Sequence, residues 1–188
     1  MLAYVFWHWK SSSLEDARYE ELIRNFHASL AAAPPAGFVR SAAAAVEGAR
    51  WAASGGRSYE EWYGTRGFAD FDALNEGAVG PAHAAAHDAV ARAAGGGTAG
   101  VYRLRRGEAG PGGVLFAHWF DKPAGMRYAE LDRLLEPFTG PAAALWMRQM
   151  VLGPSPELCI RSAEPLALPD PLRPLILPLR PVWPPPRG

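Results

Sequence analysis

The chain has 188 residues, of which 49% are hydrophobic and 11% aromatic, enough to bury the core of one large or two small domains. Lysine plus arginine equals aspartate plus glutamate at 19 each, so the formal charge is zero and the charge attraction behind nonspecific nucleic-acid binding is missing. The single cysteine, Cys159, excludes an internal disulfide and a zinc site built on cysteines.

The first nine residues are apolar, but no basic stretch precedes them and Lys10 ends the run. This pattern is typical of neither a secretory signal nor a membrane span. We therefore expect a cytoplasmic protein that has neither a nucleic acid nor a membrane as a partner.

The sequence pattern of residues 1–108 predicts one ferredoxin-like unit. Runs of β-branched and aromatic residues predict strands at 3–9, 38–46, 59–63 and 101–104. Apolar residues at helical spacing predict a first helix at about 19–30 and a second beginning near Phe68, kinked at Gly80-Pro81 and ended by the glycine run 95–97. The order is βαββαβ, the split-βαβ pattern.

Residues 109–164 predict a second, incomplete copy of this unit. The sequence Phe6-Trp7-His8-Trp9 returns as Phe116-Ala117-His118-Trp119, and Arg40 returns as Arg148. The offset falls from 110 to 108 along the chain, as changes in loop length between two copies would produce. A strand at 114–120, a helix from Tyr128 and strands near 144–152 and 158–161 complete the copy.

Residues 165–188 predict a proline-rich arm. Nine of these 24 residues are proline, so we expect neither the second helix nor the fourth strand of the second copy to form here. The arm is expected to be extended or disordered. Its apolar side chains favour a polyproline-like segment that lies on a surface.

These residues resemble the dimeric α/β-barrel superfamily, in which two ferredoxin-like units pack sheet against sheet around a cavity. The strand Phe6-Trp7-His8-Trp9, followed by the helical Tyr19-Glu20-Glu21-Leu22, is also loosely similar to the EthD-type branch. The resemblance covers about residues 3–162 and implies an α+β fold in which tandem ferredoxin-like repeats form an α/β-barrel-like sandwich, the second repeat truncated.

The missing fourth strand would leave the strand that carries His118 at a sheet edge, and an open edge invites pairing. We therefore expect either the tail around 175–177 or a second protomer, in a homodimer, to cover this edge.

Four residues are the candidates for catalysis: His8, His118, Arg40 and Arg148. Strand alternation puts Tyr4, Phe6 and His8 on one face, and His118 in the equivalent place of the second copy. If those faces line the space between the sheets, the two histidines act as acid and base from opposite walls. The arginines would clamp a carboxylate or an enolate.

Plainer interpretations stay open for each candidate. The histidines could cap strand ends or be hydrogen-bonded in a core, and the arginines could form surface ion pairs with Glu60 or Glu61. The candidate substrate-binding residues are aromatic and belong to the same predicted strands: Tyr4, Phe6, Trp62 and Phe116.

His83 and His87 have the spacing of a helical two-histidine metal site, but no third ligand is identifiable, so we predict no metal site. His27 is interpreted as a favourable charge at a helix end, and Cys159 as a small buried side chain. The usual motifs of nucleotide hydrolysis, dinucleotide-dependent redox and serine-hydrolase chemistry are absent.

The leading interpretation is a protein that binds a small aromatic or polyketide-like molecule. The resemblance implies cofactor-independent acid–base or oxygen chemistry, such as enolisation, cyclisation or monooxygenation, and whether the protein is an enzyme stays open. A haem-binding protein of the same fold, with a histidine on the iron, is one alternative. A non-catalytic module that docks through the proline-rich arm is the other.

Overall fold

The computed structural model describes residues 1–52, 57–108 and 113–184. In the first half of the chain the elements are β1 (Leu2–Lys10), α1 (Asp16–Ala32), β2 (Phe38–Glu47), β3 (Arg57–Thr65), α2 (Ala69–Val79), α3 (Ala84–Ala93) and β4 (Ala94–Arg106). In the second half they are β5 (Phe116–Phe120), α4 (Tyr128–Leu135), η1 (Glu136–Phe138), β6 (Ala143–Arg148), β7 (Leu158–Ser162), η2 (Asp170–Leu172) and β8 (Leu175–Trp183). The predicted boundary at 108/109 adjoins residues 109–112, which lie outside the described residues.

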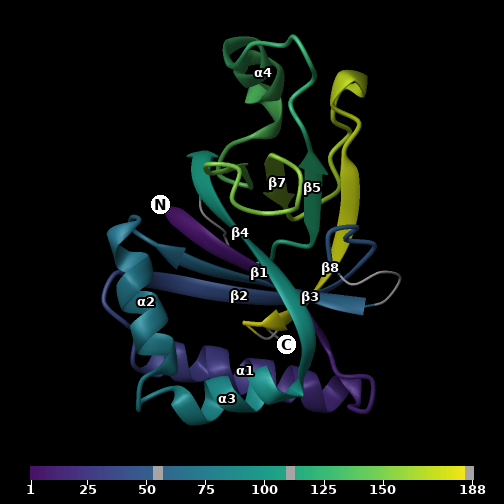
Figure 1. Ribbon diagram of the computed structural model, residues 1–188. Coiled ribbons are helices and arrows are strands. Elements are labelled where there is room, and N and C mark those ends of the chain that lie inside the picture. The colour runs from purple at the N-terminus through teal and green to yellow at the C-terminus, as the bar shows by residue number, and fades with distance from the viewer. Residues whose placement is uncertain (53–56, 109–112, 185–188) are drawn as a thin grey trace.

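Within the described residues, eight strands close into one antiparallel barrel in the order β1-β3-β2-β8-β5-β7-β6-β4. The first half contributes β4-β1-β3-β2 and the second β8-β5-β7-β6, so each half has its first strand between its fourth and its third. The prediction of an α+β barrel is confirmed. Figure 1 shows the two halves one above the other, with α1, α2 and α3 on the lower half and α4 on the upper.

Side chains from alternate positions of the strands fill the inside of the barrel. Trp7, Trp62, Trp119 and Trp146 are all buried there, together with Tyr102. Because large aromatic rings pack at the density of a solid, the inside of the barrel is a core. Side chains therefore fill the space between the two sheets, where the sequence predicted a ligand cavity.

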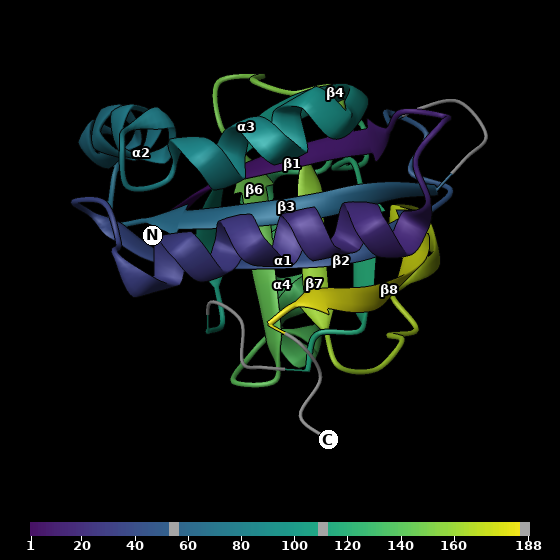
Figure 2. The same ribbon diagram turned by 90° about the horizontal axis from the view of Figure 1, so that it is seen from below.

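The outer faces of the two halves are covered differently. In the first half, α1 and α3 lie across the outer face of the sheet, and α2 continues this layer (Figure 2). In the second half, α4 and the residues around η2 pack directly on the strands through Leu131, Leu135 and Leu172. Between β7 and β8 the structure has the short η2 where the first half has two helices.

The proline-rich tail contains a strand, contrary to the sequence-based prediction. β8 pairs with β5 and with β2 and so joins the two halves. His118 is paired with Ile176, which confirms that the tail covers the edge beside His118. The tail is thus part of the barrel rather than an arm on its surface.

Proline is tolerated in β8 because the strand changes neighbour along its length. Residues 175–178 pair with β5, whereas residues 179–183 pair with β2. Each part of the strand is therefore paired on one side only. Pro178 and Pro181 lack a backbone N–H, but a strand paired on one side does not need a donor at every residue. Arg180 adds a salt bridge to Glu20 of α1, which fixes the end of the strand.

The helix before the glycine run 95–97 ends at Ala93, as predicted, but the run itself lies in β4, which begins at Ala94 instead of 101. A β-carbon on Gly97 would lie 2.4 Å from the ring of Phe6, and one on Gly96 would lie 2.5 Å from the ring of Trp9. Glycine is required here because aromatic rings of β1 lie against the backbone of β4. The predicted kink at Gly80-Pro81 is confirmed as a break between α2 and α3.

No helix in the described part of the chain has the length and apolar character needed to cross a membrane.

The alternation in β8 gives a test of its place in the barrel. Leu177 is 2% exposed and faces the core, whereas its neighbour Ile176 is 40% exposed. We expect Leu177→Ala to lower the free energy of unfolding by about 2–5 kcal/mol, measured by urea denaturation, because it leaves a cavity. The matched variant Ile176→Ala should cost less than about 1 kcal/mol, since exposed positions rarely matter more. Equal costs would contradict the described register.

Candidate functional site

A cavity of about 800 Å³ lies between the outer face of the first half's sheet and the helices that cover it. It is lined from β1, β3 and β4 on the sheet side and from α1, α2 and α3 on the helix side. The lining residues are Tyr4, Phe6, His8, Tyr19, Phe26, Glu61, Tyr63, Phe71, Leu74, Asn75, Ala78, Val79, His87, Val90, Ala91, Ala94, Gly95, Gly96, Gly97 and Val101.

One wall of the cavity is a row of flat rings from β1. Phe6 stacks on Tyr4 with ring centroids 6.3 Å apart and on His8 with centroids 4.9 Å apart. The wall beside it is the bare backbone of the glycine run 95–97. A flat, mainly apolar molecule matches this shape, because it can lie against the rings and the glycine backbone.

The polar end of the cavity is built on Glu61, which strand alternation in β3 directs away from the barrel and toward α1. Its carboxylate oxygen Oε1 lies 3.1 Å from His8 Nε2, and the other ring nitrogen of His8, Nδ1, lies 2.6 Å from the Tyr19 hydroxyl. Glu61 is 2% exposed and His8 is fully buried. Tyr19, His8 and Glu61 thus form a continuous polar array that begins at the cavity wall.

A second imidazole supports the same carboxylate. His27 of α1 has Nε2 3.5 Å from Glu61 Oε1 and Nδ1 2.6 Å from the Ser41 hydroxyl of β2. The Tyr63 hydroxyl donates to Glu61 Oε2. The prediction that His27 merely places a charge near a helix end is wrong, because this residue is fully buried against the sheet.

These neighbours decide the charge of Glu61. Burial alone would raise the pKa of this carboxyl, but the charge that His8 carries when it is protonated and the adjacent imidazole of His27 outweigh it, and the pKa lies well below its usual range. Burial raises the pKa of Tyr63 and of Tyr19, and the negative charge of Glu61 raises both further. The site therefore holds an anionic carboxylate beside neutral phenols.

His8 and His118 do not face one another, so the predicted acid–base pair across the barrel is wrong. Both imidazoles lie on outer faces of the barrel, under different layers. His118 Nδ1 lies 3.1 Å from the Ile160 carbonyl oxygen, and His118 Nε2 accepts from the Leu166 amide at 2.9 Å. Both ring nitrogens of His118 are satisfied by backbone, and burial lowers the pKa of this imidazole. His118 is thus a hydrogen-bonded core residue, the plainer of the two interpretations.

The two arginines predicted to clamp an oxyanion are not among the residues that line the cavity. Arg148 donates to the carbonyl oxygens of Gly153 and Ser155 and so holds the loop that follows β6. Arg40 lies half-buried on the barrel side of β2, where burial and the positive charge of Arg161 lower the pKa of its guanidinium. The predicted clamp is therefore not formed at this cavity.

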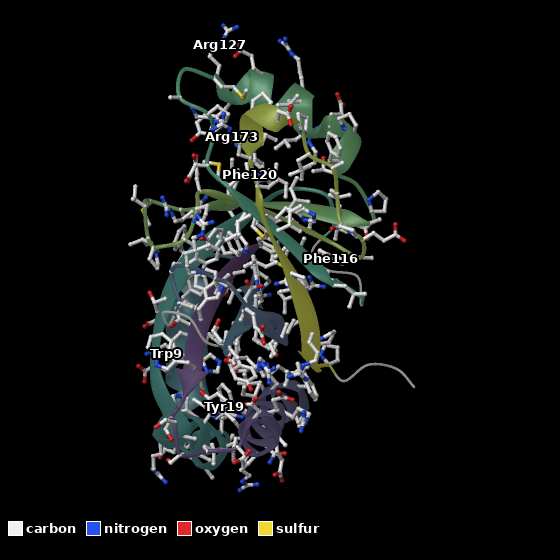
Figure 3. The ribbon with its side chains drawn as sticks, turned by 90° about the vertical axis from the view of Figure 1, so that its right-hand side faces the viewer. Trp9, Tyr19, Phe116, Phe120, Arg127 and Arg173 are labelled. Atoms are coloured by element: carbon white, nitrogen blue, oxygen red, sulfur yellow. The ribbon has the colours of Figure 1, made fainter. Side chains whose placement is uncertain are left out.

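The predicted substrate-binding residues divide in the same way. Tyr4 and Phe6 line the cavity. Trp62 faces the inside of the barrel, where Arg161 lies over its ring. Phe116 belongs to the second half and, in Figure 3, lies far above Tyr19. Trp62 and Phe116 thus have no contact with the cavity, because the ligand space lies on the outer face of one half only.

His83 and His87 do not form a metal pair. His83 is buried just before α3, with its ring nitrogens 3.2 Å from the Ser29 hydroxyl and 3.0 Å from the Ala33 carbonyl oxygen. His87 is half-exposed at the cavity. Among the described residues, no group of three or more His, Cys, Asp and Glu side chains is arranged to hold a metal ion.

A haem does not fit these residues. His8 has Tyr19 on one ring nitrogen and Glu61 beside the other, so neither nitrogen is available to iron. The residues that line the cavity include no lysine or arginine to pair with the two propionates of a haem. His87 is the other imidazole in the lining. It is half-exposed, and its Nδ1 lies 3.2 Å from the Asp88 carboxylate.

Sequence reasoning missed Glu61, Tyr19 and His27 as parts of a site. One signal was available: Glu61 is a carboxylate in the middle of a predicted strand rich in aromatic residues, where an ion needs a partner. The partners come from β1 and α1, and only the packing of α1 on the sheet brings them together.

No protein-family model matches the chain, and no curated protein matches its sequence. Solved structures match over almost the whole length. A candidate monooxygenase from Fusobacterium nucleatum superposes with a TM-score of 0.62 at 11% identity, over 96% of this chain and 92% of that one. The chain shares the α+β barrel fold of this protein.

Two further structures support the same conclusion. An anthrone oxidase-like protein matches with a TM-score of 0.50 at 10% identity, over 96% of this chain and 90% of that one. A candidate chlorite dismutase matches with a TM-score of 0.51 at 10% identity, over 96% of this chain and 94% of that one. Identities this low establish the fold and nothing finer.

The depressed pKa of Glu61 gives a stability test. In the unfolded chain a glutamate titrates near its ordinary value of about 4.3, and the folded chain holds the proton less well. Glu61 therefore adds stability that is fully present above this value and is lost as the pH falls toward the folded-state pKa. We expect the difference in unfolding free energy between the wild type and Glu61→Gln to shrink as the pH falls below about 4. A difference that stays constant with pH would show that Glu61 is not ionised in the folded protein.

The poor fit to haem gives a second test. We expect haem added to the purified protein to produce no absorbance change that saturates at one equivalent, because the cavity offers no buried free imidazole and no cation. His87→Ala serves as the control and should behave like the wild type. A saturating band in the wild type that disappears in this variant would overturn the conclusion.

Proposed function

We propose that this protein is an enzyme that needs no cofactor and removes a proton from a flat, mainly apolar small molecule bound in the cavity. The observation that carries the proposal is the array Tyr19–His8–Glu61, in which a buried anionic carboxylate is next to an imidazole that reaches a cavity-wall hydroxyl. A base–orienter pair of this kind is the usual arrangement for general acid–base catalysis.

The groups beside the two ring nitrogens of His8 support one direction of proton movement. The Glu61 carboxylate favours a proton on His8 Nε2, so Nδ1 carries the lone pair and accepts from the Tyr19 hydroxyl. When a substrate C–H or O–H loses its proton to the Tyr19 oxygen, the hydroxyl proton moves to His8 Nδ1. The imidazolium that forms lies 3.1 Å from the Glu61 carboxylate, which stabilises its charge.

The lining of the cavity restricts the substrate. It offers rings, alanines and glycine backbone, and its one carboxylate, Glu61, is anionic. A substrate with a carboxylate at the polar end would be repelled, because the lining has no lysine or arginine to offset Glu61. A neutral cyclic ketone or phenol with an acidic hydrogen fits this lining, because it is flat and apolar and has no carboxylate.

Oxygen chemistry is the step that we propose after proton removal. An electron-rich enolate can react with dioxygen without a metal, and the cavity both shields the enolate from water and holds it against flat rings. The names of two proteins of similar fold, a candidate monooxygenase and an anthrone oxidase-like protein, support this choice of chemistry.

We also propose that the two halves of the barrel are copies of one ferredoxin-like unit. The shared strand order supports this, as does the equivalent position of His8 and His118 on the first strand of each half. In this view the second copy has filled the outer face with α4 and η2 and has kept its histidine as a core residue. One copy alone then carries the site.

Exchange of hydrogen for deuterium on anthrone, a flat tricyclic ketone with an acidic methylene group, tests the proposal. In heavy water, followed by NMR, we expect the protein to accelerate the exchange and His8→Gln to lower the rate by roughly 10²–10⁴-fold, the usual contribution of a general acid–base group. Tyr19→Phe should lower it as well. Uptake of dioxygen, measured separately, reports the second step.

His118→Gln is the matched control, since it changes the equivalent histidine outside the cavity and should retain the exchange rate of its folded fraction. The proposal fails if His8→Gln and His118→Gln lose the same activity. Binding of anthrone without any acceleration of exchange would instead make the protein a carrier or a sensor.

A further inference from the structure

A turn between β6 and β7 presents three consecutive apolar side chains to solvent. Met150 is 70% exposed, Val151 80% and Leu152 46%. Apart from the first two, no large apolar side chain in the described residues is more than half exposed. In Figure 2 this turn, drawn in yellow-green, projects beyond β4 at the top of the view. Adjacent apolar side chains at the end of a projecting turn are typical of a contact surface.

The backbone of the same turn is in a conformation that its residues disfavour. The φ angle is 51° at Met150 and 57° at Val151, and the Leu152 amide donates to the Gln149 carbonyl oxygen at 2.8 Å. A tight turn with two left-handed residues is most stable with asparagine and glycine, whereas a β-branched side chain there costs free energy. Neither solvation nor backbone geometry therefore favours Met150 and Val151 at these positions. A cost of both kinds at the same residues indicates that their side chains have a partner.

The base of the turn is hydrogen-bonded within the protein. The Gln149 amide donates to the Val101 carbonyl oxygen of β4 at 2.8 Å, and the Leu152 carbonyl oxygen accepts from the Val101 amide at 3.0 Å. The Gly153 carbonyl oxygen accepts from the Arg148 guanidinium at 2.9 Å. Hydrocarbon offers no hydrogen bonds, so a segment that enters it needs its backbone groups paired within the protein. The turn is thus anchored on β4 in a form suited to an apolar phase.

Positive charge lies beside the apolar tip. The exposed Arg103 donates from Nε to the Gln149 side-chain oxygen at 3.1 Å. Its guanidinium lies 5.9 Å from the centroid of the exposed Phe68 ring. An apolar tip with guanidinium groups at its base is complementary to the surface of an anionic bilayer, because the tip reaches the acyl chains while the cations meet the headgroups.

We propose that this turn docks the protein on an anionic lipid bilayer, with Met150, Val151 and Leu152 among the lipids and Arg103 at the level of the headgroups. This proposal replaces the expectation, from the sequence alone, of a protein without a membrane partner. Val101, to which the turn is bonded, also lines the cavity. Docking thus brings the cavity close to the phase in which a flat, apolar molecule collects. The inference does not depend on the proposed proton-transfer activity.

Cosedimentation of the full chain with lipid vesicles tests the proposal. The vesicles consist of phosphatidylcholine alone or of equal amounts of phosphatidylcholine and phosphatidylserine. We expect the wild type to bind the mixed vesicles about 10-fold more tightly than the neutral ones, because each arginine near an anionic surface contributes roughly fivefold. Arg103→Gln should weaken binding to the mixed vesicles about fivefold and leave binding to the neutral vesicles unchanged.

The double variant Met150→Asn with Val151→Gly separates docking from folding. It should weaken binding to the mixed vesicles by about 100-fold, because two apolar side chains no longer enter the bilayer. Its melting temperature should be higher than that of the wild type, because asparagine and glycine suit the left-handed turn. A loss of binding in a more stable protein cannot come from misfolding.

Val39→Asn is the matched control. Val39 is exposed on β2, at the opposite edge of the first half's sheet from β4, so this variant should bind vesicles as the wild type does. Equal binding by the wild type and the double variant would overturn the proposal, as would a wild type that binds no vesicle. Self-association that the double variant abolishes, without vesicle binding, would also overturn it and would assign the tip to a protein contact.

Discussion

Two adjacent carboxylates on β3 are buried on opposite faces of the sheet, and each must be compensated from its own side. Glu60 points into the barrel and Glu61 points toward α1. An uncompensated ion at either place would cost several kcal/mol, so the surrounding residues are those that can donate a hydrogen bond or carry a charge. Indoles and a guanidinium surround Glu60, and imidazoles and a phenol surround Glu61. The polar features of both compartments follow from this constraint.

The fold of the first half could be predicted from local patterns, because its strands and helices have the periodicity of half-buried elements. The prediction failed where local and global requirements disagree. Composition alone correctly makes glycine at 95–97 the end of a helix but does not show that these residues lie in a strand, and it makes proline in the tail a strand breaker. Contacts with Phe6 and Trp9 explain the glycines, and a change of partner along β8 explains Pro178 and Pro181.

The candidate site was predictable in part. Alternation along β1 correctly put Tyr4, Phe6 and His8 on one face, but it could not say which face is the inside of the barrel. Glu61 and His27 escaped because their partners are far apart in sequence and meet only when α1 packs on the sheet. Arg148 was misjudged because a repeat indicates equivalent positions, whereas the role of each side chain depends on its own loop.

β8 follows all the other described strands in the sequence, and this order has a consequence for folding. The strand joins β2 to β5, and its pairing with β2 brings residues 45 and 180 side by side. Contacts so distant in sequence form late and slowly. Until β8 has paired, β2 and β5 each present an unpaired strand edge and the ring stays open. The incompletely folded protein is exposed to aggregation through these two edges in that interval.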